Sequence, residues 1–281
     1  MHSISQQLVE ARMKLALVSQ ENAALEARLL AAHAWRMTPE ELVFYGRDAR
    51  DPASFAALIE RRLKAEPVAQ ILGEKHFWRD VFSVSRDVLT PRADSETMIE
   101  ALLRARGDHK AALRLLDLGT GSGCLLLSAL REYPNASGVA VDQSTAALAV
   151  ARKNAAALGL QDRCAMLHSS WCSKVEGRFD VVLSNPPYIP SADIAALDAD
   201  VREFEPHTAL DGGADGLRDY RALVQQLPLH LNPGALVLFE VGQGQAAYVA
   251  ALGQQAGWNL KEIAKDLAGI ERVVVFEITK E

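Results

Sequence analysis

The segment Asn185-Pro186-Pro187-Tyr188 places an amide, two prolines and a phenol directly after an apolar run, residues 179–184. Proline cannot donate to a sheet ladder, and the residue before a proline is kept out of the helical region. We therefore predict a rigid loop at the end of a buried strand. Such a loop could serve only the fold. It could also act as a clamp, in which the Asn185 side-chain oxygen and the Pro186 carbonyl each accept one N–H hydrogen of a planar amide or amine.

A glycine-rich stretch, LLDLGTGSGCLLLSAL, reads as a strand, a turn and a helix. Gly119, Gly121 and Gly123 let the backbone pass close to a ligand, and the helix start beyond them offers free amide donors. A phosphate-binding P-loop would need a lysine, and the dinucleotide pattern would need glycine where Cys124 stands. A ligand-binding loop of another kind is expected, the alternative being a tight strand-to-helix turn.

Two carboxylates narrow the choice of ligand. Asp117 stands at the end of the strand before the glycines, where it would repel a pyrophosphate but could pair with a cationic ligand. Asp142 ends the next expected strand and could accept hydrogen bonds from two ribose hydroxyls, or it could cap the helix ahead of Ser144. Trp171 follows the third strand and could stack on adenine or simply pack at a domain edge. A ligand with a ribose, a positive end and no phosphate is S-adenosylmethionine.

The clamp then suggests a reaction. A planar amide nitrogen is hard to methylate because its lone pair is delocalised. Two fixed acceptors favour a geometry in which that lone pair points at the methyl group, and Tyr188 offers a flat face that excludes water. No strong base is needed before transfer, since the product cation loses its proton easily.

Alternating elements must position these loops. From about residue 112 onward, apolar strands alternate with helical segments. This is typical of a doubly wound, mostly parallel sheet, whose ligands bind at the carboxyl ends of the strands. The expected strands are residues 114–118, 138–141, 164–168, 179–184, 235–241 and 272–278, and the expected helices between them are residues 123–132, 144–158 and 219–227.

The part of the chain before residue 91 has a different pattern. Residues 1–72 show helical spacing of apolar side chains and predict a small helical bundle. Residues 73–90 alternate in short runs and predict a β-hairpin linker, after which residues 91–281 form the α/β domain.

Composition limits the function further. The chain has 281 residues, 49% of them hydrophobic, and a formal net charge of −6, which gives no general basic field for nucleic acid. The three cysteines show no metal-ligand spacing, and we expect no metal site. No signal peptide or membrane span is evident. We expect a cytoplasmic, reduced protein and, by default, a monomer.

The clamp beside this glycine loop resembles the amino-methyltransferases. Three further stretches extend the likeness: EPVAQILGEKHFWRDVFSVSRDVLTPRADSE before the loop, REFEPHTALDGGADGLRDYR after the clamp, and the helical bundle in front. Together, over nearly the whole chain, they resemble the peptide-chain release factor glutamine methyltransferases, the PrmC/HemK family. The fold implied is a Rossmann-like class I S-adenosylmethionine-dependent methyltransferase domain preceded by a helical bundle and a hairpin linker.

The resemblance also implies roles. The reaction would be methylation of the glutamine side-chain amide in the Gly-Gly-Gln motif of bacterial class I release factors, with S-adenosylhomocysteine as by-product. The bundle would dock the release factor. The expected catalytic residues are Asn185, Pro186 and Tyr188; the expected substrate contacts are these three with Pro187, Arg92 and Glu205, the last in a rim of residues 205–216 that admits the peptide loop. The expected cofactor contacts are Asp117, Gly119, Thr120, Gly121, Ser122, Gly123, Asp142, Ser170, Trp171 and Asn185.

The sequence departs from the family pattern at two places. Ala93 stands where the family usually has a second proline, which should hold Arg92 less rigidly. Ser170 stands before Trp171 where the family usually has an aspartate suited to the adenine amine, so we expect weaker cofactor binding than with aspartate.

Three other functions share some of these features. A nucleic-acid amino-methyltransferase would use the same loop and clamp, but it would need a flipped base and a basic recognition region. A ribosomal-protein glutamine would undergo the same chemistry. A non-catalytic adaptor would bind the cofactor or the release factor without using the clamp.

Overall fold

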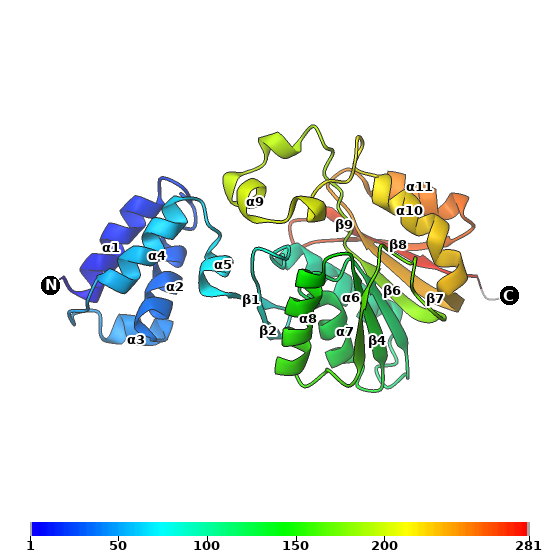
Figure 1. Cartoon of the computed structure of the whole chain (residues 1–281), viewed down its shortest axis with the longest axis horizontal. Coiled ribbons are helices and arrows are strands. Elements are labelled where there is room, and N and C mark those ends of the chain that lie inside the picture. The colour runs from blue at the N-terminus through cyan, green and yellow to red at the C-terminus, as the bar shows by residue number, and fades with distance from the viewer. Residues whose placement is uncertain (1, 280–281) are drawn as a thin grey trace. The chain divides into compact units, whose positions relative to one another are not determined.

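The computed structural model describes residues 2–279 of the chain. They divide into two compact units, each with its own core (Figure 1). Within the described residues, the first consists of residues 2–74 with Asp198–Phe204, and the second of Lys75–Leu197 with residues 205–279. The N-terminal segment of the first unit ends at Glu74, and the predicted domain boundaries at residues 72 and 90 stay predictions.

The first unit is the predicted helical bundle. Its N-terminal helices are α1 (Ile4–Leu15), α2 (Ala23–Trp35), α3 (Pro39–Phe44), α4 (Ala53–Leu63) and α5 (Val68–Leu72). Capping boxes begin two of them: Ser3 pairs with Gln6 at α1, and Thr38 with Glu41 at α3. The apolar faces of α1, α2 and α4 meet in one core that contains Leu15, Leu30 and Phe55.

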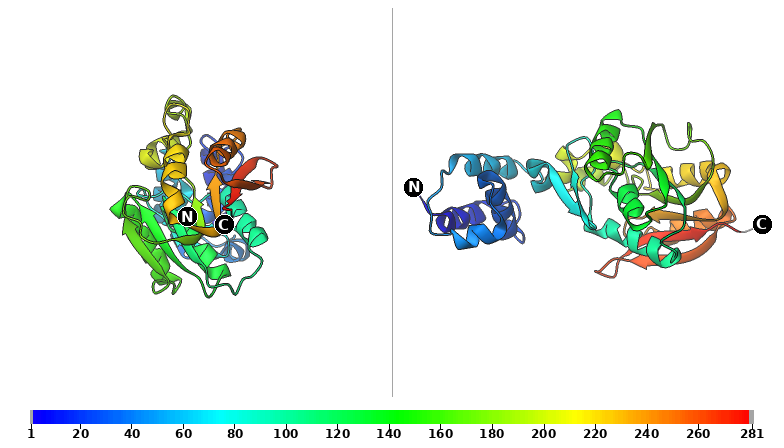
Figure 2. Two further views of the ribbon diagram at one scale, coloured as in Figure 1. Left: turned by 90° about the vertical axis from the view of Figure 1, so that its right-hand side faces the viewer. Right: turned by 90° about the horizontal axis from the view of Figure 1, so that it is seen from below.

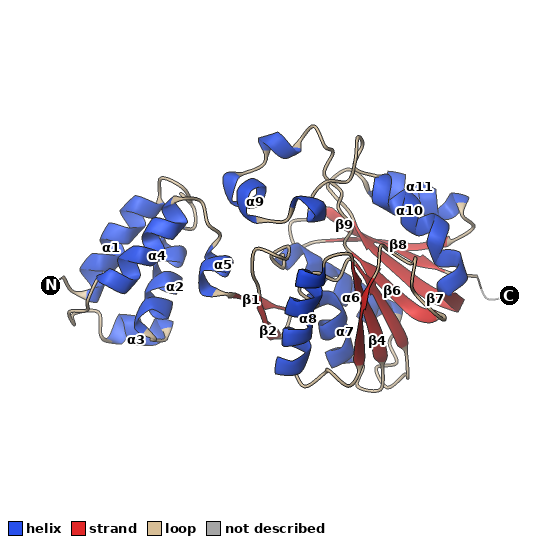
Figure 3. Cartoon of the chain, in the orientation of Figure 1, coloured by secondary structure: helices blue, strands red, loops and turns tan. Residues whose placement is uncertain are grey.

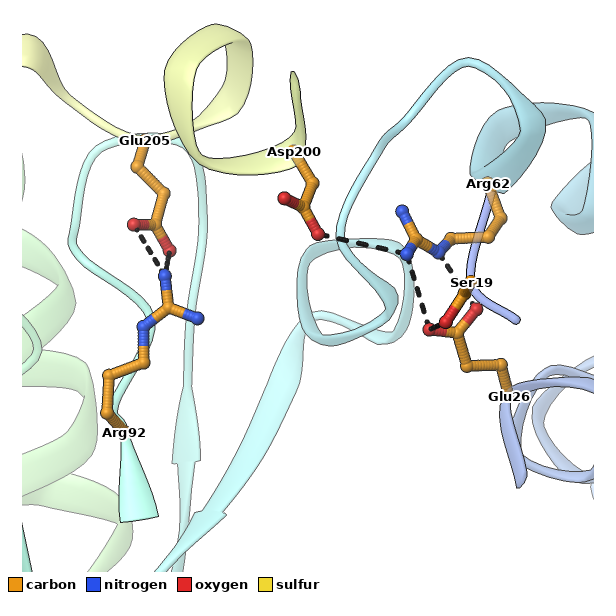
Figure 4. A network of polar contacts seen from close by, with 6 residues as sticks. All are labelled: Ser19, Glu26, Arg62, Arg92, Asp200 and Glu205. Atoms are coloured by element: carbon orange, nitrogen blue, oxygen red, sulfur yellow. Dashed lines mark hydrogen bonds and ion pairs between the residues drawn. The ribbon is translucent and has the colours of Figure 1, made fainter. Parts of the chain in front are cut away.

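One short helix joins this bundle from far along the sequence. Helix α9 (Ala199–Phe204) lies in the first unit, although the sequence predicts that everything after residue 90 is one domain. Arg62 holds it by an ion pair with Asp200 at 3.7 Å (Figure 4). The Gln70 side chain also donates to the Phe204 carbonyl at 3.0 Å. Apolar periodicity cannot predict that α9 joins the bundle, because the contacts that hold it are polar. Gln70 and Phe204 are also 134 residues apart in the sequence.

The second unit begins with the predicted hairpin, β1 (Glu74–Phe77) and β2 (Asp80–Ser83), and continues as a seven-stranded sheet. The order is β5-β4-β3-β6-β7-β9-β8, parallel except for β9. The strands are β3 (Arg114–Leu118), β4 (Ser137–Asp142), β5 (Cys164–His168), β6 (Phe179–Ser184), β7 (Leu231–Glu240), β8 (Asn259–Lys265) and β9 (Glu271–Glu277). The predicted strands are all present, and β8 is an addition.

Helices cover both faces of this sheet (Figures 2 and 3). One core cluster contains side chains of α6 (Glu96–Ala105), α7 (Cys124–Glu132) and α8 (Thr145–Ala157). The other contains side chains of α10 (Arg218–Gln226) and α11 (Ala246–Gln255). Short 3-10 turns complete the unit at Ala93–Ser95, Ile194–Ala196, His207–Ala209 and Leu227–His230.

The chain reverses its direction of travel across the sheet next to β3. From β3 it proceeds through β4 to β5 on one side, and then crosses to β6 and β7 on the other. Ligands of such sheets bind at the carboxyl ends of the strands beside this reversal. The glycine loop follows β3 and the Asn-Pro-Pro-Tyr segment follows β6, so the two predicted ligand loops lie at that point.

Candidate active site

A cavity of about 340 Å³ lies within the second unit at the carboxyl ends of β3, β4, β5 and β6. The glycine loop, the segments after β4 and β5, and the clamp residues Asn185 and Pro187 line it. Ten further residues lie on the wall: Asp87, Val88, Leu89, Pro91, Ser95, Pro206, Thr208, Ala209, Arg218 and Asp219. Predicted cofactor residues on its wall are Gly119, Thr120, Gly121, Ser122, Asp142, Ser170, Trp171 and Asn185. Asp117 and Gly123 are not on the wall.

The glycines of the loop pack against different neighbours. All three have positive φ: +78° at Gly119, +53° at Gly121 and +83° at Gly123. A Cβ on Gly119 would lie 3.4 Å from the ring of Trp171, so this glycine leaves room beside the cavity. A Cβ on Gly123 would lie 3.1 and 3.3 Å from Leu127 and Ala151, so Gly123 permits close packing of α7 on α8.

Asp142 braces the glycine loop. One carboxylate oxygen accepts from the Gly121 amide at 2.9 Å, and the other accepts from the Ser144 amide at 2.8 Å. The same side chain therefore fixes the loop after β3 and the turn ahead of α8, while it still faces the cavity. The cap of α8 is Ser144 itself, whose hydroxyl accepts from the Ala147 amide at 3.1 Å. The lone pairs that remain on Asp142 could accept from ribose hydroxyls, and this contact stays a prediction.

Asp117 lies beneath the loop. It is fully buried, and one of its oxygens accepts from the Thr120 hydroxyl at 2.6 Å. Its Oδ1 has no partner within the described structure. Burial raises the pKa of this carboxyl to about 7, against the opposing hydrogen bonds from Thr120 and the Leu126 amide. Asp117 lies under the loop and does not line the cavity. Its direct contact with a cationic ligand therefore stays a prediction.

Trp171 closes one side of the cavity in a strained conformation. Its φ of +45° lies in the left-handed region, which a non-glycine residue occupies at a cost of about 1–2 kcal/mol. The indole edge passes over Gly119. Ser170 before it is exposed and also lines the cavity. Both residues line the cavity, and their contact with adenine stays a prediction.

Three glycines pack closely against the backbone and ring of clamp residues 187–188. A Cβ on Gly212 would lie 2.7 Å from the Pro187 carbonyl oxygen, and a Cβ on Gly242 would lie 3.0 Å from the Tyr188 ring. Gly216 packs equally close to the Tyr188 carbonyl. The glycines of the predicted rim, residues 205–216, therefore serve the clamp itself by holding residues 187–188 in place.

Hydrogen bonds fix the clamp further. The Ile189 amide donates to the Leu210 carbonyl at 3.0 Å, and the Gly212 amide donates to the Ile189 carbonyl at 2.9 Å. The Gln245 side chain donates to the Tyr188 carbonyl at 2.9 Å. Burial raises the pKa of Tyr188 to about 12, so its phenol stays neutral at physiological pH.

The two predicted substrate contacts outside the clamp bind each other. Arg92 donates to both carboxylate oxygens of Glu205 at 2.9 Å (Figure 4). The Thr90 amide donates to the same carboxylate at 3.3 Å. The Glu205 side chain is 1% exposed, whereas Arg92 is 46% exposed. The pair ties the segment after α9 to the segment before α6. Neither residue lines the cavity.

Several cavity residues escaped the sequence prediction. Ser95 precedes α6, Gln143 follows Asp142, and Arg218 and Asp219 begin α10. None of them belongs to a motif with a recognisable spacing, and tertiary folding brings them to the wall. Glu240, which ends β7 and does not line the cavity, was also not singled out, although a carboxylate that ends an otherwise apolar strand could have drawn attention to it.

The cavity fits S-adenosylmethionine by its donor and acceptor set. Backbone amides of the glycine loop, the Asp142 carboxylate and the indole of Trp171 surround one space of suitable size. Among residues 2–279, no group of three or more His, Cys, Asp or Glu side chains could hold a metal ion. Sheet order, glycine loop and clamp together define the class I S-adenosylmethionine-dependent methyltransferases.

Comparisons with known proteins narrow this class. The family model described as Methyltransferase small domain matches residues 92–199, and the PrmC N-terminal domain matches residues 6–73. The chain is 45% identical to the release factor glutamine methyltransferase of Rhodospirillum rubrum, over 94% of this chain and 81% of that protein. The corresponding Cereibacter sphaeroides protein is 44% identical, over 93% of both. The chain belongs to the release factor glutamine methyltransferase family.

Solved structures agree on the fold alone. The catalytic domain of hMettl16 gives a TM-score of 0.57 at 13% identity and covers 71% of this chain and 76% of that one. A methyltransferase from Pyrococcus furiosus gives 0.52 at 19% identity, over 70% and 88%.

Proposed function

We propose that this protein methylates the side-chain amide nitrogen of the glutamine in the Gly-Gly-Gln motif of bacterial class I release factors. The observation that carries the proposal is the rigid Asn185–Tyr188 segment beside a cavity suited to S-adenosylmethionine. The likeness to release factor glutamine methyltransferases over 94% of the chain supports the choice of substrate. S-adenosylmethionine would supply an electrophilic methyl group on a sulfonium.

The chain's own residues have two tasks in this reaction. Amides of the glycine loop, Asp142 and Trp171 would hold the cofactor, with Ser170 near its adenine. Asn185 and the Pro186 carbonyl would each accept one hydrogen of the glutamine amide. This orientation turns the nitrogen lone pair out of conjugation and towards the methyl group, and it stabilises the positive charge that develops on nitrogen.

Proton removal needs no dedicated base in this scheme. The methylated nitrogen is strongly acidic until it loses a proton, which can pass to water as the product leaves. Tyr188 is neutral and mostly buried, so it serves as a surface against the planar amide. In the same proposal the enzyme acts in the cytoplasm and is a monomer. Light scattering on the purified protein would test the oligomeric state. No described helix is long and apolar enough to span a bilayer.

Mass spectrometry on an unmethylated release factor tests the proposal. Incubation with this protein and S-adenosylmethionine should add one methyl group, mapped to the Gly-Gly-Gln glutamine, and none to a substrate whose glutamine is replaced by glutamate. Asn185→Ala should abolish transfer. The matched control is Asn135→Ala, which removes an exposed amide that donates to the Lys110 carbonyl. Intact cofactor binding with no methylation of any release factor would overturn the substrate assignment.

A further inference from the structure

The carboxyl ends of β6 and β7 place a buried glutamate beside the clamp. The two strands are parallel, and Ser184 is opposite Phe239. The next residues, Asn185 and Glu240, are therefore neighbours at the same edge of the sheet, with side chains towards the same face. Glu240 is only 2% exposed, and β9 pairs with it on the other side. Its main-chain carbonyl accepts from the Tyr220 hydroxyl at 2.6 Å.

The surroundings of the Glu240 carboxyl are polar but incomplete. The Ser95 and Asn185 side chains both lower the pKa of this carboxyl and so lie close to it, while its Oε2 is buried without a hydrogen-bond partner in the described structure. Burial raises the pKa of this carboxyl to about 7, with Ser95 as the largest opposing influence. The titratable and charged groups that face it come from five elements or loops: Arg272, Asp94, Cys124, Tyr188 and Tyr220.

Glu240 can influence Asn185 because an asparagine side chain carries both an oxygen, which accepts hydrogen bonds, and an NH2 group, which donates them. To accept an N–H of the substrate, as the proposed function requires, Asn185 must direct its oxygen to the cavity and its NH2 group elsewhere. An ionised carboxylate only accepts hydrogen bonds, so it selects the NH2 end. A protonated carboxyl can donate, and it then tolerates the reversed amide.

We propose that Glu240 is a positioning residue, whose ionised carboxylate holds the Asn185 NH2 group and so aims the Asn185 oxygen at the substrate amide. This inference rests on the proposed function for its role in transfer. The Asn185–Glu240 contact itself is independent of any substrate. Ser95 assists by donating its hydroxyl to the same carboxylate.

Nuclear magnetic resonance of asparagine-labelled protein tests the contact directly. The Asn185 side-chain amide signals, identified by their loss in Asn185→Asp, should titrate with a midpoint near pH 7. In Glu240→Gln this titration should vanish. Glu132→Gln is the matched control, because Glu132 is a largely buried carboxylate at the end of α7 that accepts from the Trp78 indole and does not line the cavity. Signals that ignore both pH and the Glu240 substitution would overturn the proposal.

Kinetics test the consequence for transfer. Glu240→Gln should lower kcat roughly 10- to 100-fold, with the cofactor Kd and the KM for release factor within about twofold of wild type. The fall in wild-type kcat below pH 7 should be absent from this variant, and Glu240→Asp should recover part of the rate. An unchanged kcat and pH profile in folded Glu240→Gln would reject the positioning role. If wild type methylates no release factor while Asn185 titrates as expected, the proposed function fails and the contact stands.

Discussion

The Ser184 hydroxyl donates a 2.7 Å hydrogen bond to the main-chain carbonyl of Leu118. Leu118 precedes the glycine loop and Ser184 precedes the clamp, so this one bond joins the cofactor side of the site to the substrate side. Both residues are fully buried. This side-chain bond reinforces the pairing of β3 with β6, in which Leu118 is opposite Ser184.

Ser184→Ala should lower the free energy of unfolding by about 1–2 kcal/mol, because the Leu118 carbonyl loses a buried donor. It should also lower kcat more than it weakens cofactor binding. Urea unfolding and steady-state kinetics measure both effects. Ser128→Ala is the control: its hydroxyl is buried and has no hydrogen-bond partner among residues 2–279, so its removal should be neutral or stabilising. Equal losses from the two variants would contradict the role given to Ser184.

Asp142→Asn should weaken cofactor binding at least tenfold by calorimetry. Each of the two Asp142 oxygens accepts from one backbone amide, that of Gly121 or that of Ser144. An asparagine side chain has only one oxygen, so one of these amides would face its NH2 group. Asp180→Asn is the matched control, since Asp180 accepts from the Arg114 amide and from Asn232 at the opposite ends of the strands. Its cofactor Kd should equal that of wild type.

The Arg92–Glu205 pair should show an asymmetric response to substitution. Arg92→Met leaves a buried carboxylate without its guanidinium and should cost about 2 kcal/mol of stability at pH 8. Glu205→Gln leaves a half-exposed guanidinium that water can solvate, and should cost about 1 kcal/mol or less. The double variant should be no less stable than Arg92→Met. Equal losses from the two single variants would argue against this account.

The same pair predicts a pH dependence. Burial raises the pKa of Glu205, and Arg92 opposes that rise. Removing Arg92 raises this pKa further, so the carboxyl becomes protonated more readily as pH falls. The deficit of Arg92→Met relative to wild type should therefore be smaller at pH 5 than at pH 8, as measured by denaturant unfolding.

Glu240 should make the protein less stable as pH rises. Its folded pKa of about 7 lies above its ordinary value of 4.5, so the unfolded chain releases the proton first. As the pH rises from 4.5 to 7, the free energy of unfolding should decrease by on the order of 3 kcal/mol because of this group. Above pH 7 it should level off. Glu240→Gln should reduce that fall and be at least as stable as wild type at pH 8. A Glu240→Gln curve parallel to wild type would show that the buried carboxylate carries no such cost.

Ser170→Asp should tighten cofactor binding. Ser170 lines the cavity and is a neutral acceptor where an adenine amine is expected, and a charged acceptor forms a stronger hydrogen bond. Calorimetry at constant pH measures the change. An unchanged or weaker affinity would mean that Ser170 does not contact the adenine amine.

Local patterns were enough to predict most of the second unit. The spans of β3, β5 and β6 are those expected from apolar runs bounded by turn residues. Alternation of strands and helices also predicted that the glycine loop and the clamp meet, because parallel strands bring their carboxyl ends to one edge. Strand β8 was missed because its apolar residues are few and it is an exposed antiparallel edge.

By itself, the sequence determined the fold class, the two ligand loops and the resemblance to a glutamine methyltransferase family, because these depend on short-range periodicity and on motifs contiguous in the chain. Tertiary structure alone decided which groups support them. Helix α9 lies with the N-terminal bundle, Arg92 meets Glu205, and Glu240 lies beside Asn185. These pairings join polar residues far apart in sequence, and no local propensity selects a partner over such separations.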